Sequence, residues 1–409
     1  MLFRRLHKRS FYLLSFLLIC CIATTKGQSF SLNGDKKRVT LPFKFIRNLV
    51  IINLEINNAG PYNFILDTGV GFMIITEPTL VDSINISSKR TVKISGLGNG
   101  ESYEAYVTPP LTIKIPGIVS NNVSAAILKT DHFGLSEYAG MPIHGLLGYE
   151  FFSQLAVKVS FTDTTLMVTR PKDMRKFKKG IRLPITIELN KPYIQAKITR
   201  VDGTQQFSKL IVDLGAGHSV SLENVTDKNA LTTKYIDANL GIGINGVITG
   251  QMGRLKELAL GKYGLKDVLA AFPETNTTAL SIKRDGNIGV DMLKKFTIVF
   301  DYTDKAIYLK PSVGFKTPSE HDMSGLEYYA AGENYKNIII ERVEPGSPGE
   351  EAGLCKNDEI TAINFKPVSK MTLEQIDQLF KSKNNRSLLI NFYRNNEREQ
   401  AILTLKRRI

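Results

Sequence analysis

The sequence of 409 residues has little of the chemistry that supports disulfide, zinc or serine-hydrolase sites. It contains no tryptophan, three cysteines and five histidines. Cys355 is the only cysteine after residue 27, so the rest of the chain can form neither an internal disulfide nor a cysteine-based zinc site. The histidines form no His-Glu-x-x-His motif, and no Gly-x-Ser-x-Gly elbow is present. We therefore predict no metal site and no organic cofactor.

Acidic residues are missing from the first 27 positions, which hold basic residues close to the start. A run of 13 mostly apolar residues, Phe11 to Ala23, follows them and is shorter than the about 20 residues that cross a bilayer. This pattern predicts a signal peptide over 1–27 and an exported protein of the periplasm, the cell envelope or the medium. Lipidation at Cys20 or Cys21 and an uncleaved anchor are the alternatives; once the signal is cleaved, no part is expected to be integral to a membrane.

Basic residues outnumber acidic ones, 53 to 39, which gives a net charge of +14. Spread over so long a chain, this surplus is weak support for nucleic-acid binding, so we expect no nucleic-acid partner. The hydrophobic fraction of 43% and charged fraction of 22% are those of a globular chain long enough for two to four domains.

One pattern occurs twice at long range. Both copies are an aliphatic strand that ends in Asp-x-Gly-x-Gly, at Asp67 and at Asp213, and a hairpin pattern precedes each. A second shared element follows each copy, with Gly148 placed 81 positions after Asp67 and Gly289 placed 76 positions after Asp213. We infer a duplicated all-β unit, with one lobe at 28–172 and another at 183–314, joined by a basic linker at 173–182.

The duplication predicts a pair of carboxylates. A buried carboxylate needs hydrogen bonds or a partner, and the glycines after each Asp let the backbone turn tightly beside it. If the lobes pack with pseudo-twofold symmetry, Asp67 and Asp213 meet at the axis. Two carboxyl groups at one site share a proton, so that one can deprotonate water while the other protonates a carbonyl oxygen.

Asp67-Thr68-Gly69 after Phe-Ile-Leu, together with the later Leu-Leu-Gly at 146–148, resembles the retropepsin-like aspartyl proteases. The doubled arrangement is similar to exported pepsin/retropepsin-type proteins of the Bacteroidetes, which often end in a PDZ domain. The resemblance implies a mainly β fold with two pseudo-symmetric β-barrel lobes and catalytic residues Asp67 and Asp213. It also implies that Thr68, Gly69 and Gly215 support the catalytic loops.

The second copy departs from the family pattern, because it reads Asp213-Leu214-Gly215 rather than Asp-Thr-Gly or Asp-Ser-Gly. In the family that hydroxyl forms a hydrogen bond across the lobe interface and braces the pair. Thr68 keeps its half of this brace and Leu214 cannot supply the other. We favour an active enzyme, and a catalytically inactive peptide-binding scaffold of the cell envelope is the alternative.

Glycine-rich stretches follow each Asp and predict flaps that cover substrate, with Gly96 and Gly98 in the first lobe and Gly243 in the second. An ordinary hairpin turn is the alternative for both. The second stretch also reads Gly-x-Gly-x-x-Gly, but no helix pattern follows it, so we do not interpret it as a dinucleotide site.

The last segment, 322–409, changes character. Its run Pro345 to Val368 resembles the PDZ domains of bacterial periplasmic proteases, and helical spacing is predicted over 372–380 with Thr372 as the cap. The resemblance implies a site for an extended or C-terminal peptide, with Gly325 and Leu326 near its carboxylate. A module that only packs on the lobes is the alternative. Taken together, the sequence predicts an exported aspartic endopeptidase that acts on peptides or proteins.

Overall fold

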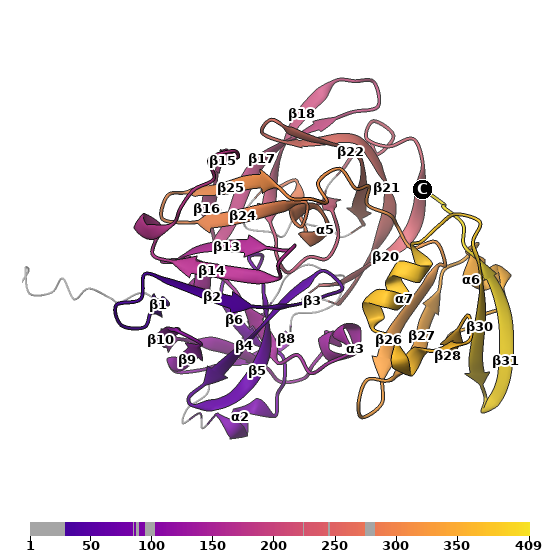
Figure 1. The fold of residues 1–409 in the computed structure, drawn as a ribbon, viewed down its shortest axis with the longest axis horizontal. Coiled ribbons are helices and arrows are strands. Elements are labelled where there is room, and N and C mark those ends of the chain that lie inside the picture. Colours follow the sequence, from indigo (N-terminus) through magenta and orange to yellow (C-terminus); the bar gives the residue numbers. More distant parts are fainter. Residues whose placement is uncertain are drawn as a thin grey trace, which may run out of the picture.

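The computed structural model describes residues 29–84, 86, 90–94, 103–223, 225–243, 246–274 and 283–409. The fold is mainly β, with four sheets and a few short helices (Figure 1). In the part of the chain that the structure describes, no helix is both long and apolar enough to span a membrane.

The first sheet belongs to the N-terminal part of the chain, which we call the first lobe. Its main strand order is β1-β10-β9-β4-β5-β12-β6-β11-β8-β7, and β3 pairs with β4. The strands are β1 (Ser31–Leu32), β3 (Lys44–Ile46), β4 (Leu49–Ile56), β5 (Ala59–Leu66), β6 (Met73–Ile75), β7 (Arg90–Ile94), β8 (Tyr103–Val107), β9 (Leu111–Ile115), β10 (Ile118–Val123), β11 (Ala125–Leu128) and β12 (Gly145–Leu147).

The second lobe repeats this arrangement. Its sheet has the order β16-β17-β18-β23-β19-β22-β21-β20, in which the run from β17 to β20 matches the run from β4 to β7 strand for strand. The strands are β16 (Thr186–Glu188), β17 (Lys191–Thr199), β18 (Gln205–Val212), β19 (Val220–Leu222), β20 (Tyr235–Gly243), β21 (Gly246–Leu260), β22 (Tyr263–Pro273) and β23 (Gly286–Ile288). The duplication read in the sequence therefore has a counterpart in strand topology.

A third sheet takes strands from both halves of the chain, in the order β15-β25-β24-β13-β14-β2. It contains β2 (Arg38–Pro42), β13 (Ala156–Ser160), β14 (Thr165–Thr169), β15 (Ile181–Pro184), β24 (Phe296–Asp301) and β25 (Ala306–Pro311). At its centre β13 of the first half pairs antiparallel with β24 of the second. Both lobes and this sheet share one continuous hydrophobic core, so burial of apolar surface holds the two lobes together.

The short helices lie between these strands. They are α2 (Leu80–Ser83), α3 (Leu135–Ala139), α4 (Tyr149–Phe152) and α5 (Val290–Leu293), with a 3₁₀ turn at η1 (Pro171–Asp173). Helices α4 and α5 follow Gly148 and Gly289, the downstream glycines of the two sequence copies.

The C-terminal module has a sheet and a hydrophobic core of its own. The sheet order is β26-β27-β28-β30-β31, so β26 is an edge strand. Its elements are β26 (Leu326–Ala331), β27 (Asn337–Val343), β28 (Glu359–Ile363), β29 (Lys366–Pro367), β30 (Ser387–Arg394), β31 (Glu397–Thr404), α6 (Pro348–Glu351), η3 (Val368–Lys370) and α7 (Leu373–Phe380). Thr372 caps α7 in a reciprocal capping box with Gln375, which confirms the predicted cap.

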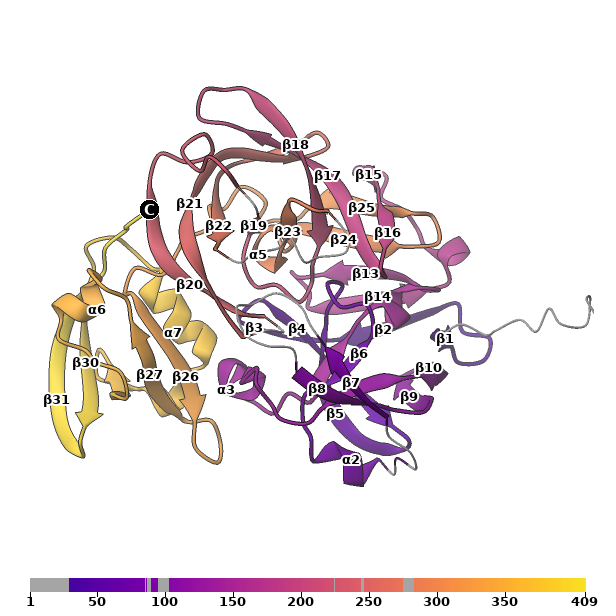
Figure 2. The ribbon, with the colours of Figure 1, turned by 180° about the vertical axis from the view of Figure 1, so that it is seen from behind.

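The module packs against both lobes. The two views show α3 of the first lobe beside β26 and α7 (Figures 1 and 2). Asn239 on β20 donates a hydrogen bond of 2.7 Å to Glu327 on β26, which joins the module to the second lobe. Edge strand β26 is therefore contacted from both lobes.

Candidate active site

The strand topology brings Asp67 and Asp213 to equivalent places. Each directly follows a strand, β5 or β18, whose last three residues are buried, and its backbone N–H donates to the strand that runs parallel beside it. Asp67 donates to Leu147 at 3.0 Å, and Asp213 donates to Ile288 at 2.9 Å. The carboxyl groups are therefore held at the ends of two symmetry-related strand pairs.

The two loops interlock so closely that only glycine fits at the third position of each. A Cβ added to Gly215 would lie 2.2 Å from Cγ of Asp67, and a Cβ added to Gly69 would lie 2.6 Å from Oδ1 of Asp213. These distances are far below van der Waals contact. Each glycine thus lets its loop pack directly against the carboxyl group of the other lobe.

The hydrogen bonds to the two carboxyl groups are unequal. Oδ1 of each accepts the N–H two residues on, from Gly69 at 2.7 Å and from Gly215 at 2.9 Å. Oδ2 of Asp213 also accepts from Nδ2 of Asn287 at 3.0 Å. Because donated hydrogen bonds favour negative charge on a carboxylate, Asp213 is the better site for that charge.

Asn287 is itself held by a histidine. Its Oδ1 lies 2.8 Å from Nε2 of His218, and because an amide oxygen can only accept, Nε2 carries the proton. Burial lowers the pKa of His218, so the ring is neutral at neutral pH. The result is a directed chain from His218 through Asn287 to Asp213.

The cross-loop brace exists in one direction. Oγ1 of Thr68 donates to the carbonyl of Val212 at 2.6 Å and accepts the N–H of Leu214 at 2.9 Å. Leu214 stands where the second hydroxyl would be and is fully buried in the apolar core. The first lobe therefore braces the second, and the second lobe has no hydroxyl to return the contact.

Asp67 is 8% exposed, and its surroundings favour its protonated form. Burial and then the nearby charge of Asp213 raise the pKa of Asp67 well above its ordinary value. The N–H of Gly69 and the charge of Lys191 act in the opposite direction. Lys191 begins β17 on the register position that Leu49 holds in β4, so the second lobe places a cation where the first places a leucine.

Two asparagines, one in each lobe, donate hydrogen bonds to the loop of the opposite lobe. Nδ2 of Asn48 donates to the carbonyl of Gly217 at 2.7 Å, and Nδ2 of Asn190 donates to the carbonyl of Gly71 at 3.0 Å. Each accepting glycine is the fifth residue of its Asp-x-Gly-x-Gly motif. The second glycine of the motif is therefore the point where the opposite lobe holds the loop.

The downstream glycine of each copy packs directly against the loop that carries the carboxyl group. A Cβ on Gly148 would lie 2.4 Å from the carbonyl oxygen of Val70, and one on Gly289 would lie 2.3 Å from that of His218. Both oxygens belong to the loops that carry the carboxyl groups. The spacing read in the sequence therefore corresponds to direct packing of the two elements.

Family models match two parts of this chain. The model for aspartyl protease matches residues 52–151, which include Asp67, Thr68, Gly69 and Gly148. The model for the PDZ domain matches residues 339–394. The chain thus combines an aspartyl protease domain with a C-terminal PDZ domain. The protease match ends in α4 of the first lobe, and the second lobe repeats its strand order and its Asp-containing loop.

The predicted flaps fall on equivalent hairpins, β7–β8 and β20–β21. Gly96 and Gly98 lie outside the described residues, between β7 and β8. Gly243 ends β20, and its register partner Gly246 begins β21, where an added Cβ would lie 3.7 Å from the hydroxyl oxygen of Tyr103 at the start of β8. The two hairpins therefore approach one another from opposite lobes.

In the PDZ domain, Leu326 begins β26 and Gly325 directly precedes it. The N–H of Gly325 donates to Asp322 at 2.8 Å, and that of Leu326 donates to the hydroxyl of Ser324 at 3.1 Å. In this arrangement both N–H groups are taken by the chain's own side chains. The site predicted for a ligand carboxylate thus contains the carboxyl group of Asp322.

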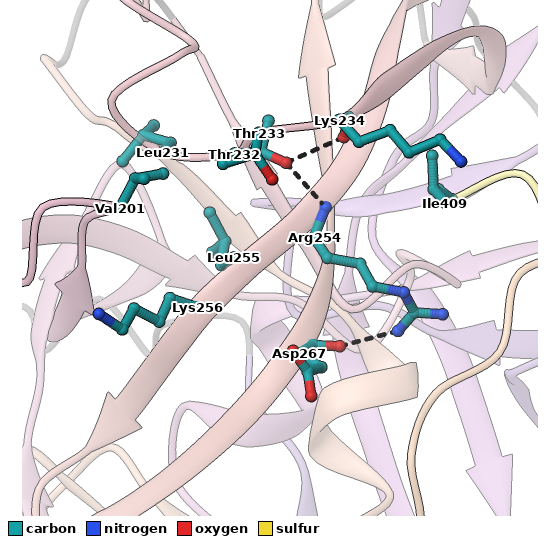
Figure 3. Close-up of a pocket in the computed structure, with 10 residues that line it drawn as sticks. All are labelled: Val201, Leu231, Thr232, Thr233, Lys234, Arg254, Leu255, Lys256, Asp267 and Ile409. Carbon is teal, nitrogen blue, oxygen red and sulfur yellow. Dashed lines mark hydrogen bonds between the residues drawn. The ribbon is translucent and has the colours of Figure 1, made fainter.

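A pocket lies on another face of the second lobe, along β21 and beside the C-terminal residue Ile409 (Figure 3). Arg254 donates across it to the carbonyl of Asp267 at 2.9 Å. Neither Asp67 nor Asp213 lines this pocket.

Four residues at the site were not singled out from the sequence: Asn48, Asn190, Lys191 and Asn287. A signal existed for Asn287 alone, because alignment of the two copies places it opposite Leu146, where a polar residue interrupts an apolar strand. The others lie in or beside hairpin turns, and the sequence does not show where those turns are directed.

Proposed function

We propose that the chain is an exported aspartic endopeptidase that cleaves peptide bonds with the Asp67–Asp213 pair. The observation that carries the proposal is the interlocked pair of loops, in which two carboxyl groups share one site with unequal hydrogen bonds. Asp67, whose pKa burial raises, is the proton donor, and Asp213, which accepts from Gly215 and Asn287, is the base.

In this mechanism Asp213 takes a proton from a water molecule while the oxygen of that water bonds to the scissile carbonyl carbon. Asp67 gives its proton to the carbonyl oxygen, which produces a tetrahedral diol without a metal or cofactor. The diol then returns a proton to Asp67 while the C–N bond breaks. The proton held by Asp213 passes to the leaving amine, and the pair regains its starting state.

The β20–β21 hairpin fits the role of a substrate cover. Ile242 and Val247 pair across its tip and are 46% and 51% exposed, so two aliphatic side chains lie side by side at the surface. A peptide beneath the hairpin would bury them and exclude water from the pair. We propose a peptide or protein substrate in extended form, with localisation in the periplasm or cell envelope.

The test is cleavage of a diverse peptide library by residues 28–409 between pH 3 and 8. We expect cleavage by the parent protein and none by Asp67→Asn or Asp213→Asn. Asp35→Asn, at an exposed site, is the matched control and should retain full activity. Cleavage that persists in Asp213→Asn would refute the proposed pair.

A second candidate is an inactive peptide-binding scaffold, which the missing hydroxyl at Leu214 favours. It predicts that labelled library peptides bind the folded parent protein and that none is cleaved at any pH. Binding that is equal in the parent and in Asp213→Asn, without turnover in either, would replace the peptidase proposal with this one.

A further inference from the structure

The turn between β3 and β4 consists of Arg47 and Asn48, both with positive φ, 48° and 64°. The Arg47 side chain leaves the first lobe and enters the PDZ domain, where it is 7% exposed. Its Nε and Nη2 donate to the two carboxylate oxygens of Asp377 on α7, at 3.1 and 2.9 Å. This two-pronged geometry is the strongest form of the arginine–carboxylate pair.

The same guanidinium also contacts β26. Its Nη1 donates to the carbonyl of Tyr328 at 3.2 Å, and its carbon lies 4.5 Å from the centre of the Tyr328 ring. It also lies 5.0 Å from the centre of the ring of Tyr138 in α3. Because β26 is an edge strand, the Tyr328 carbonyl is one of the acceptors that an added peptide strand would use.

Gly140, at the end of α3, fills the neighbouring space. A Cβ placed on it would lie 2.8 Å from Cδ1 of Leu373 on α7 and 3.5 Å from Cβ of Ala330 on β26. Arg47 and Gly140 of the first lobe therefore occupy the interval between β26 and α7. A peptide could enter there only by displacing them.

Asn48, the other residue of the turn, reaches the catalytic loop of the second lobe. Its Nδ2 donates to the carbonyl of Gly217, four residues after Asp213, and its Oδ1 accepts from Nζ of Lys294 at 3.1 Å. One two-residue turn thus contacts the PDZ domain through its first side chain and the loop of Asp213 through its second.

The second lobe contains the matching turn without the PDZ contact. Leu189 and Asn190 have φ of 45° and 64°, and Asn190 holds Gly71 just as Asn48 holds Gly217. Leu189, on the position equivalent to Arg47, is 63% exposed. The turn that holds the Asp213 loop is therefore anchored to the PDZ domain, whereas the residue at the equivalent position of the other turn, Leu189, is exposed.

From this asymmetry we infer that the PDZ domain is part of the catalytic apparatus: through Arg47 and Asn48 it positions the loop that carries Asp213. Arg47, Asn48 and Asp377 are positioning residues, and none touches the carboxyl pair. The effect on turnover rests on the proposed peptidase function, whereas the effect on the loop does not. Occupation of β26 by a peptide and anchoring of the loop exclude one another.

Hydrogen exchange of backbone amides tests the effect on the loop without turnover. In Arg47→Leu and Asp377→Asn we expect amides of 214–219 to exchange about five- to tenfold faster, the factor that corresponds to one hydrogen bond. Amides of 68–73, held by Asn190, should not change. Leu189→Ala is the matched control and should alter neither loop.

Asp377→Asn changes the PDZ domain only, so it keeps the test valid if Arg47→Leu fails to fold. Unchanged exchange over 214–219 in Asp377→Asn, or equal acceleration in both loops, would overturn the inference.

A double-mutant cycle on kcat and KM provides the second measurement. If Arg47 acts through Asp377, the double variant should lose no more kcat than either single variant, with KM nearly unchanged. Additive losses, or losses in KM alone, would refute a positioning role. Altered exchange in a protein that cleaves nothing would retain the inference and reject the proposed peptidase.

Discussion

Replacing Asn287 by leucine, the residue at the equivalent position of the first lobe, isolates the hydrogen bond that distinguishes the two carboxyl groups. The substitution removes the donor 3.0 Å from Oδ2 of Asp213 and also frees Nε2 of His218. The strand pairing of β23 with β18 and β19 uses backbone atoms, so it does not depend on this side chain. The direct effect therefore falls on negative charge at Asp213.

The size of the effect follows from the chemistry of the contact. A hydrogen bond to a charged group contributes about 1.5–3 kcal/mol, and about 1.4 kcal/mol corresponds to a factor of ten. If Asp213 must be ionised to accept the proton of water, the variant needs a higher pH to reach the active state. At a pH on the acid limb of the profile, kcat/KM should therefore fall by about ten- to a hundredfold.

The assay is the pH dependence of kcat/KM from pH 3 to 8 on the best library peptide. We expect the acid limb of Asn287→Leu to move upward in pH, with activity approaching that of the parent protein at the plateau. Ser221→Ala alters the residue paired with Asn287 across β19 and removes no hydrogen bond of Asp213, so it serves as control. An equal loss at every pH would show a general structural defect and would exclude a specific effect of Asn287 on Asp213.

Three further predictions concern other groups. Burial raises the pKa of Glu150 to about 7 from 4.5, so the stability that its protonated form provides is present below pH 4.5 and is lost as pH rises through 7. Glu150→Gln should therefore raise the free energy of unfolding at pH 8 by about 3 kcal/mol, measured by urea titration. An identical pH dependence of stability in both proteins would contradict this. Lys191→Leu removes a charge that lowers the pKa of Asp67, so the alkaline limb of the pH–rate profile, which reports Asp67 as the proton donor, should move upward; a limb that stays in place or moves downward would exclude this role. Leu214→Thr should restore a hydrogen bond from the second loop to the first. The double variant Leu214→Thr/Asp213→Asn should still cleave no peptide, because the carboxyl group itself is missing.

The Asp-x-Gly-x-Gly motif could be recognised twice in the sequence because all of its residues lie within five positions of one another. The cap of α7 at Thr372 was predictable for the same reason, since capping depends on residues three positions apart.

Contacts between segments that are far apart in the sequence could not be predicted from a local pattern of this kind. Asn48 and Gly217 are 169 positions apart, and a polar residue in a two-residue hairpin turn is expected whether or not it reaches another loop. The ion pair of Arg47 with Asp377 spans 330 positions and depends on how the PDZ domain docks. Such contacts arise from tertiary packing, which local patterns do not determine.

The departures from symmetry converge on one loop. Leu214 removes the hydroxyl that would complete the brace, while Asn287 adds a hydrogen bond to Asp213 and Arg47 anchors the turn that holds Gly217. If the last two contacts compensate for the first, Leu214→Thr should recover part of the kcat/KM lost in Asn287→Leu. In the parent background the same change should have little effect, because the loop is already held. A double-mutant cycle measures this coupling. Equal effects of Leu214→Thr in both backgrounds would show that the contacts act independently and that the loop needs no second brace.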